Sequence, residues 1–143
     1  MTVKDILSLK GNQVLTIEPT ATLATAVQIL AQRRIGALVV TGADSHIVGI
    51  ISERDIVRVL GEKGTAVLGA PVAEAMTRKV VTCALNETIA EIMERMTGGK
   101  FRHVPVVEHE RLAGIVSIGD VVKARLSELE HEHDALREYI RTA

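Results

Sequence analysis

The chain repeats one pattern of residue types along its length. Residues 14–57 and 80–122 present the same order of apolar, polar and acidic positions at an offset near 66, and Asp55, for example, matches Asp120. The offset between matched residues changes from 66 to 67 at residues 97–100, and then to 65 in the next polar segment. Loops accept such changes in length and packed elements do not. The sequence therefore predicts a duplicated supersecondary unit.

Each copy is predicted to begin with a short β-strand and a helix. The β-prone runs are residues 14–17 and 80–83, and residues of the type that caps helices follow at Thr20 and Asn86. The next apolar positions are spaced i, i+3, i+4 and i+7, which places them on one face of an α-helix. These positions are Leu23, Ala26, Val27 and Leu30 in the first copy and Ile89, Ile92, Met93 and Met96 in the second.

The second part of each copy is predicted to be a β-hairpin followed by another helix. Branched residues form two runs around a short polar turn in residues 37–51, and again in residues 104–116. Two such runs across a short loop are typical of an antiparallel hairpin. A helical stretch then begins at Ser52 and at Ser117. Each copy therefore has the predicted order β-α-β-β-α.

The duplication divides the chain into two units, a linker and a tail. The predicted boundaries are residues 1–63 for the first unit, 64–71 for a linker with glycine and proline, 72–125 for the second unit and 126–143 for a helical extension. A unit of roughly 60 residues buries too little surface to be stable alone, so the two are expected to pack on each other. The fold class expected is α/β (α+β), with the two units packed sheet to sheet.

Composition excludes several classes of function. Lys and Arg total 17 against 18 for Asp and Glu, and the net charge of -1 disfavours general binding to nucleic acid or to an anionic membrane. The single cysteine, Cys83, excludes an internal disulfide and a cysteine-based zinc site. The first 13 residues lack the apolar stretch of a signal peptide, and nowhere do 18 apolar residues run together. We expect a soluble, cytoplasmic protein.

The most informative polar positions lie where the last strand of each copy meets its last helix. The two segments read GIISERD at residues 49–55 and GIVSIGD at residues 114–120. A serine followed three residues later by a carboxylate is a capping box, which satisfies amides at a helix N-terminus. The same pair beside free amides also suits the hydroxyls of a ribose with a phosphate nearby. The motif by itself leaves both interpretations open.

Basic residues lie close to both junctions in the sequence. They are Arg33 and Arg34 before the first hairpin, Arg54 within the first junction, and Lys100, Arg102 and His103 before the second hairpin. Several cations near a helix N-terminus are the outline of a phosphate site. A solvated charged rim is the alternative, particularly for Arg33 and Arg34.

These features resemble a known family. The two junctions, together with FRHVPVV at residues 101–107, are similar to the tandem cystathionine β-synthase (CBS) domain pair, also called a Bateman module. The resemblance covers about residues 1–125. It implies two pseudo-symmetric clefts between two CBS units, each able to take an adenosine-containing ligand. The ligands implied are AMP, ADP, ATP, NAD or S-adenosylmethionine.

The resemblance also implies which residues form the clefts. The aspartates hold ribose hydroxyls with the serines beside them, the threonines and strand starts line the adenine pocket, and Arg102 and His103 contact phosphate. In the second copy the residues expected to bind ligand are Thr82, Ala84, Arg102, His103, Val104, Pro105, Ser117 and Asp120. In the first copy they are Thr16, Gly36, Ala37, Ser52, Arg54 and Asp55. No residue is predicted to be catalytic or to bind a metal.

The two clefts are not expected to be equivalent. Residues 35–38 lack the arginine and histidine that stand in the matching part of the second copy, whereas Arg54 has Gly119 as its counterpart. The second-copy site is therefore predicted to be the better phosphate binder.

The C-terminal segment is predicted to be one long helix from Ile118 to about Arg141. Its apolar positions alternate steps of four and three, as in the seam of a coiled coil, and they are Val122, Leu126, Leu129, His133, Leu136 and Ile140. A tail that forms a dimer is one interpretation, and a helix folded back on its own core is the other. His131 and His133 point to different sides of a helix, so a metal site there is disfavoured.

The leading hypothesis is a stand-alone regulatory module. It binds an adenine nucleotide, reports energy or redox state to an unidentified effector protein, and assembles as a homodimer. An enzyme is disfavoured because no Cys/His pair, metal-ligand cluster or glycine-rich phosphate loop accompanies the junctions. The alternatives are a ligand-free structural or dimerisation domain, S-adenosylmethionine binding, and nucleic-acid binding, which the shortage of aromatic residues disfavours.

Overall fold

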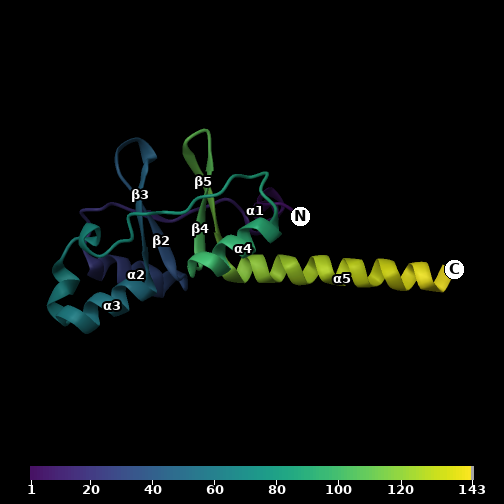
Figure 1. Ribbon diagram of the computed structural model, residues 1–143. Coiled ribbons are helices and arrows are strands. Elements are labelled where there is room, and N and C mark those ends of the chain that lie inside the picture. The colour runs from purple at the N-terminus through teal and green to yellow at the C-terminus, as the bar shows by residue number, and fades with distance from the viewer. Residues whose placement is uncertain (143) are drawn as a thin grey trace.

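Two similar units and one long helix make up the protein (Figure 1). The computed structural model describes residues 1–142. The elements are α1 (Val3–Lys10), β1 (Thr16–Ile17), α2 (Leu23–Arg33), β2 (Ala37–Thr41), η1 (Ala43–Ser45), β3 (Ile47–Ser52), α3 (Glu53–Lys63), η2 (Thr65–Gly69), η3 (Val72–Glu74), α4 (Ile89–Gly99), β4 (His103–Glu108), β5 (Arg111–Ser117) and α5 (Ile118–Thr142). The predicted mixed α/β class is confirmed, and the hairpins β2–β3 and β4–β5 stand next to one another.

The N-caps of α2 and α4 lie two residues later than predicted. Thr22 and Thr88 are the N-caps, and each hydroxyl accepts a hydrogen bond from the backbone N–H three residues further on, at 3.2 Å. The predicted caps at Thr20 and Asn86 are therefore wrong. Both residues are of the capping type, but each buried helical face begins only after the later threonine.

The first predicted strand of each copy is shorter than expected. In the first unit only Thr16–Ile17 pairs with β2, in parallel. In the second unit the run at residues 80–83 contributes a single bridge, between Cys83 and Val106. The reason lies in the tertiary structure, since Val80 and Val81 line a cleft between the units instead of extending the sheet.

Both predicted hairpins are present, and their registers correct the repeat alignment. Val40 lies opposite Gly49, and Val106 lies opposite Gly114. The preceding helices end in left-handed caps at the same offset of 66. Val40 therefore corresponds to Val106 and not to Val107, and the whole difference in length lies in the hairpin loop. Sequence alignment was one residue out because neighbouring valines are chemically equivalent.

Each hydrophobic core contains a segment that the predicted boundaries assign to the other unit. The exchanged side chains are Val3, Ile6 and Leu7 of α1 in the second core, and Val72, Ala75 and Met76 around η3 in the first core. Glycines make room for them: a Cβ on Gly49 would lie 2.6 Å from Met76 Sδ, and one on Gly114 would lie 2.8 Å from the end of Leu7. The predicted boundaries follow the sequence repeat, whereas the packing crosses them at residues 3–7 and 72–76, which we call the approach segments.

The predicted C-terminal helix is confirmed as one continuous element. Val121 and Ala124 are the buried residues of α5, and every described residue from Leu129 to Thr142 is exposed. Figure 1 shows this part of α5 extending away from the two units. The alternative in which the helix folds back on the core is therefore wrong. Among residues 1–142, no helix combines the length and the apolar character needed to cross a membrane.

Candidate ligand-binding cleft

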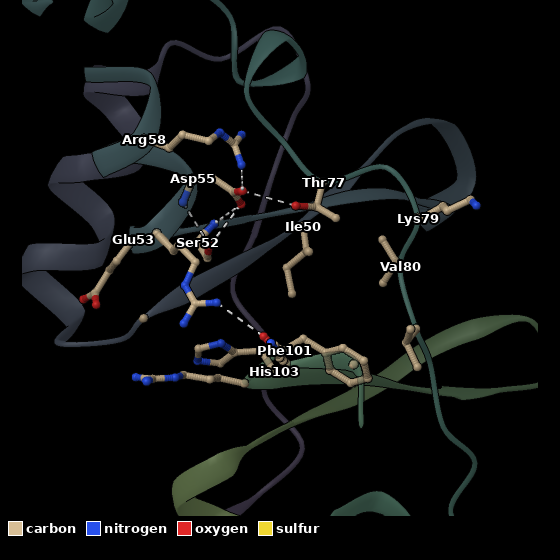
Figure 2. Close-up of a pocket in the computed structure, with 16 residues that line it drawn as sticks. Ile50, Ser52, Glu53, Asp55, Arg58, Thr77, Lys79, Val80, Phe101 and His103 are labelled. Carbon is tan, nitrogen blue, oxygen red and sulfur yellow. Dashed lines mark hydrogen bonds and ion pairs between the residues drawn. The ribbon is translucent and has the colours of Figure 1, made fainter. Parts of the chain in front are cut away.

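A cleft of about 560 Å³ brings together residues from both units (Figure 2). The first unit contributes Gly36, Ile50, Ser52, Glu53, Arg54, Asp55 and Arg58. The segment after η3 contributes Thr77, Lys79, Val80 and Val81, and the turn from α4 into β4 contributes Gly99, Lys100, Phe101, Arg102 and His103. Sites for small organic ligands typically measure about 300–1,000 Å³, so the cleft has the size of a ligand site.

Asp55 is the most constrained polar group of the cleft, with 4% of its surface exposed. Its Oδ2 accepts hydrogen bonds from the backbone N–H and the hydroxyl of Ser52, both at 3.0 Å. Its Oδ1 accepts from Arg58 Nη1 at 3.3 Å and from the Thr77 hydroxyl at 3.2 Å. A carboxylate has about four positions that accept hydrogen bonds, and the four donors within the protein already occupy them. A ribose hydroxyl would therefore replace Thr77 or Arg58 as a donor.

Cationic side chains outnumber carboxylates around the cleft. The five cations are Arg54, Arg58, Lys79, Lys100 and Arg102, against Glu53 and Asp55. Arg54 Nη1 also donates to the carbonyl oxygen of Lys100 at 3.3 Å, which links α3 to the turn before β4. Guanidinium groups match phosphate oxygens through paired N–H donors. The lining therefore attracts an anionic ligand and suits a phosphate in particular.

An apolar wall accompanies these charges. It consists of Ile50, Val80, Val81 and Phe101, and Phe101 is the only phenylalanine in the sequence. Figure 2 shows the Phe101 ring on the same side of the cleft as Val80. Branched and aromatic side chains provide flat apolar contacts on which a heterocyclic base packs. The cleft thus joins a surface for a base to a cluster of phosphate-type donors.

His103 lies at the meeting point of the two units. A Cβ on Gly36 would lie 3.1 Å from the imidazole, so the glycine permits close approach of the ring. Burial lowers the pKa of His103 below its usual 6.5, and the nearby charge of Glu53 only partly opposes this. The imidazole is therefore mostly neutral at pH 7 and acts there as a hydrogen-bonding group more than as a cation.

The second junction differs from the first because a lysine occupies it. Lys10 Nζ donates to Asp120 Oδ2 at 2.7 Å and to the carbonyl oxygen of Ile115 at 3.0 Å. Asp120 Oδ2 also accepts from the backbone N–H of Ser117 at 2.9 Å. Burial alone raises the pKa of Asp120, but the hydrogen bonds from Lys10 and Ser117 outweigh it and hold that pKa below the usual 3.8.

The exchanged approach segments explain this asymmetry. Lys10 follows Leu7 by three residues, and Lys79 follows Met76 by three residues, so the two lysines are counterparts. Lys10 closes the second junction, whereas Lys79 lines the open cleft and Thr77 contacts Asp55 instead. The same structural position therefore carries an ion-paired lysine at the second junction and a lysine of the cleft wall at the first.

The predicted site residues fall into three groups. Gly36, Ser52, Arg54, Asp55, Arg102 and His103 line the cleft, although the sequence assigned them to two separate sites. Ala37, Val104 and Pro105 are buried in strands, Thr16 and Thr82 are exposed, and the backbone N–H of Ala84 donates to Glu87. Ser117 and Asp120 form the capping box at Lys10. The ligand contacts of all these residues stay predictions.

Sequence reasoning missed several lining residues. Among them are Arg58, Thr77, Lys79 and Phe101. One signal was available, because residues 72–76 resemble residues 3–7, which implies equivalent roles for the two approach segments. The sequence did not reveal that each segment packs on the opposite unit.

Metal-ligand clusters and reactive thiols can be checked in the part of the chain that the structure describes. Within residues 1–142, no three His, Cys, Asp or Glu side chains gather closely enough to hold a metal ion. Cys83 lies in a hydrophobic core, where burial raises the pKa of its thiol to about 12. A thiol of this kind is not a nucleophile at neutral pH.

Comparison with known proteins places the chain in a family. The model of the CBS domain matches residues 2–62 and 72–127, which is a tandem pair. The chain belongs to the CBS-domain family. CBS pairs are generally regulatory modules without catalytic activity.

The similarity extends over most of the CBS pair in several proteins. The mitochondrial CBS domain-containing protein CBSX3 of Arabidopsis thaliana is 33% identical over 97% of this chain and 71% of its own length. The crystal structure of the CBS-domain protein ATU1752 from Agrobacterium tumefaciens is 51% identical, covers 87% of this chain and 99% of its own, and has a TM-score of 0.85.

Two further solved structures contain adenosine compounds. The CBS pair of protein MJ0100, in complex with 5'-methylthioadenosine and S-adenosyl-L-methionine, is 27% identical and covers 90% of this chain and 98% of its own, with a TM-score of 0.79. The CBS protein PAE2072 from Pyrobaculum aerophilum, complexed with AMP, is 27% identical and covers 84% of this chain and 89% of its own, with a TM-score of 0.75. Some CBS pairs that are similar to this chain thus bind adenosine compounds.

Proposed function

We propose that this CBS pair is a regulatory module that binds an adenine nucleotide in the cleft around Asp55. The observation that carries the proposal is the composition of that cleft. It combines a serine and an aspartate at a helix N-terminus, an apolar wall with Phe101, and five cations contributed by both units. The ribose, base and phosphate of a nucleotide each find a suitable surface there.

Charge favours a phosphate-bearing ligand over S-adenosylmethionine. The relatives MJ0100 and PAE2072 contain ligands of both kinds. The sulfonium of S-adenosylmethionine is positive, and the lining cations outnumber the carboxylates by five to two. A positive ligand group gains nothing from such a lining. AMP, ADP, ATP and NAD are therefore the proposed ligands, reporting energy or redox state.

The proposed output is a change in how the two units sit against each other. A ligand in the cleft contacts α3 of the first unit and the turn before β4 of the second, where Arg54 and Lys100 are already linked. A ligand shifts the balance between two arrangements only by its difference in affinity for them. An effector protein that recognises one arrangement would then respond to nucleotide concentration. The proposal includes that the protein is cytoplasmic, that it forms a homodimer and that it acts on an effector protein.

A specific observation supports one rival function. Both aspartates make complete capping boxes without any ligand, and Asp55 already has four internal donors. A purely structural or dimerisation domain requires no more than this. The rival predicts that adenine nucleotides leave the stability of the protein unchanged.

Thermal melts with AMP, ATP, NAD, S-adenosylmethionine and adenosine test the proposal. A ligand at about 100 times its dissociation constant stabilises the folded state by about 2.7 kcal/mol, which raises the melting temperature measurably. We expect AMP, ATP or NAD to raise it, and S-adenosylmethionine to have a smaller effect at equal concentration. Arg102→Gln should weaken nucleotide binding and spare adenosine, because it removes only a partner for phosphate.

The matched control is Arg33→Gln, the same change at an exposed arginine of α2 that lies outside the cleft. It should leave every ligand response unchanged. If no adenosine compound shifts the melt of the wild-type protein, the structural-domain function is correct and the nucleotide proposal is wrong.

A further inference from the structure

The helix α5 carries an apolar stripe that the described chain leaves exposed. The stripe consists of Val122, Leu126, Leu129, Leu136 and Ile140, with His133 in line between them. The exposed fractions of these apolar side chains lie between 43% at Val122 and 67% at Ile140. From Leu129 to Thr142 every residue is exposed, and an isolated helix of about 14 residues is only marginally stable in water. A contiguous exposed stripe on such a helix marks a contact surface.

The stripe faces away from the protein's own second unit. Val121 and Ala124 hold α5 against that unit. At about 100° per residue, the centre of the stripe lies roughly 130° around the helix from these two residues. Alternating steps of four and three keep the stripe on one side over about 27 Å of helix. A partner can therefore pack along it without displacing the internal contacts of α5.

Charged residues beside the stripe select the direction of that partner. Arg125 and Glu132 occupy g positions of the heptad, and Glu130 and Arg137 occupy e positions. In a parallel pair of identical helices, each g residue meets the e residue five places later on the other helix. Arg125 then meets Glu130 of the partner subunit, and Glu132 meets Arg137 of the partner subunit. Both contacts join opposite charges.

An antiparallel pair with the same overlap brings like charges together. Glu130 then lies beside Glu130 of the partner subunit, and Lys123 lies beside Arg137 of the partner subunit. Within one chain Arg125 Nη1 already donates to Glu128 at 3.1 Å. A guanidinium has five N–H donors, so this bond leaves donors for a second carboxylate. Charge complementarity therefore favours a second copy of this chain in parallel orientation.

We infer that α5 forms a parallel, in-register two-stranded coiled coil with α5 of a second copy. Leu126, His133 and Ile140 occupy a positions, and Val122, Leu129 and Leu136 occupy d positions. His133 faces His133 of the partner subunit, and a polar residue at an a position fixes register at a cost in stability. The inference rests on the homodimer within the proposed function, and it does not depend on nucleotide binding.

Sedimentation equilibrium of the full chain without nucleotide tests the interface. The expected wild-type mass approaches twice 15.4 kDa as concentration rises. Leu129→Glu and Leu136→Glu should each return the mass to that of one chain, because a carboxylate enters the apolar seam. The matched control is Leu9→Glu, the same change at an exposed leucine of α1, and it should leave the dimer intact. Circular dichroism checks that every variant stays folded.

Two further variants test the direction. Glu132→Arg places arginine against Arg137 of the partner subunit and should weaken the parallel dimer, and the double change with Arg137→Glu should restore it. Leu136→Cys should give a disulfide-linked dimer under oxidising conditions, since buried Cys83 does not compete.

A monomeric wild-type protein, or a dimer that Leu129→Glu leaves intact, would overturn the interface. A persistent dimer without the disulfide would overturn the parallel register. Neither result alters the nucleotide melts.

Discussion

At the scale of single residues, Lys10 decides how the two halves of the repeat differ. Its ammonium group sits 2.7 Å from Asp120, whereas the corresponding Lys79 lines the open cleft. The carboxylate of Asp120 is thereby stabilised in its charged form, which lowers its pKa. Replacing one lysine therefore changes how the stability of the protein depends on pH.

Lys10→Met should make the protein less sensitive to acid. In the wild type the folded-state pKa of Asp120 lies below 3.8, so its stabilising contribution is complete above that value and is lost as pH falls through the folded-state pKa. Without Lys10 the carboxylate keeps its hydrogen bonds from Ser117 but loses its cationic partner, so this contribution becomes smaller. Urea unfolding from about pH 6 to about pH 3 measures the effect. Lys79→Met is the control, and an equal change in both variants would contradict the assignment.

At the scale of elements, two glycines let the approach segments pack against the opposite hairpins. A Cβ on Gly49 would lie 2.6 Å from Met76 Sδ and 3.0 Å from the backbone oxygen of Thr77. Ile50 and Thr77 also exchange backbone hydrogen bonds at 3.0 and 2.8 Å. The contact leaves no room for a methyl group, so β3 can pack closely against Met76 and Thr77 only with glycine at position 49.

Gly49→Ala should destabilise the protein by about 1–3 kcal/mol, because the added methyl group forces this contact apart. Gly61→Ala should instead stabilise it by about 0.5–1 kcal/mol, since Gly61 lies in α3 with open space around it. Chemical denaturation measures both changes. Equal effects at the two positions would show that the approach segment does not hold β3 tightly.

At the scale of the whole molecule, the exchanged segments make the two units one cooperative structure. Each core takes three apolar side chains from a segment that the sequence repeat assigns to the other unit. Neither core is therefore complete without the other half of the chain. Partial unfolding of one unit removes packing from both.

Val40→Ala and Val106→Ala form a matched pair that tests this cooperativity. Both valines are fully buried, and they occupy equivalent positions in the two units. Each substitution should cost about 1–3 kcal/mol through lost contacts and a small cavity. Calorimetry should show a single transition that moves to lower temperature by a similar amount in both variants. Two separated transitions would show that the units unfold independently.

The sequence by itself determined the repeat, both hairpins, the helices α2, α3 and α4, and the long C-terminal helix α5. These features depend on periodicity and on residue preferences within short windows, which the chain carries locally. It also identified Ser52, Asp55 and Arg102 as polar groups worth placing in a site. The ligand contacts of these three residues stay predictions, because no local sequence pattern decides them.

Tertiary structure decided everything that depends on which distant segments meet. It set the register that pairs Val106 with Gly114, exchanged the approach segments, and joined Asp55 to Arg102 in one cleft although they come from different units. It also placed Lys10 on Asp120, although the two lie 110 positions apart. Contacts of this kind result from packing two whole units together, and neighbouring residues in the sequence do not encode them.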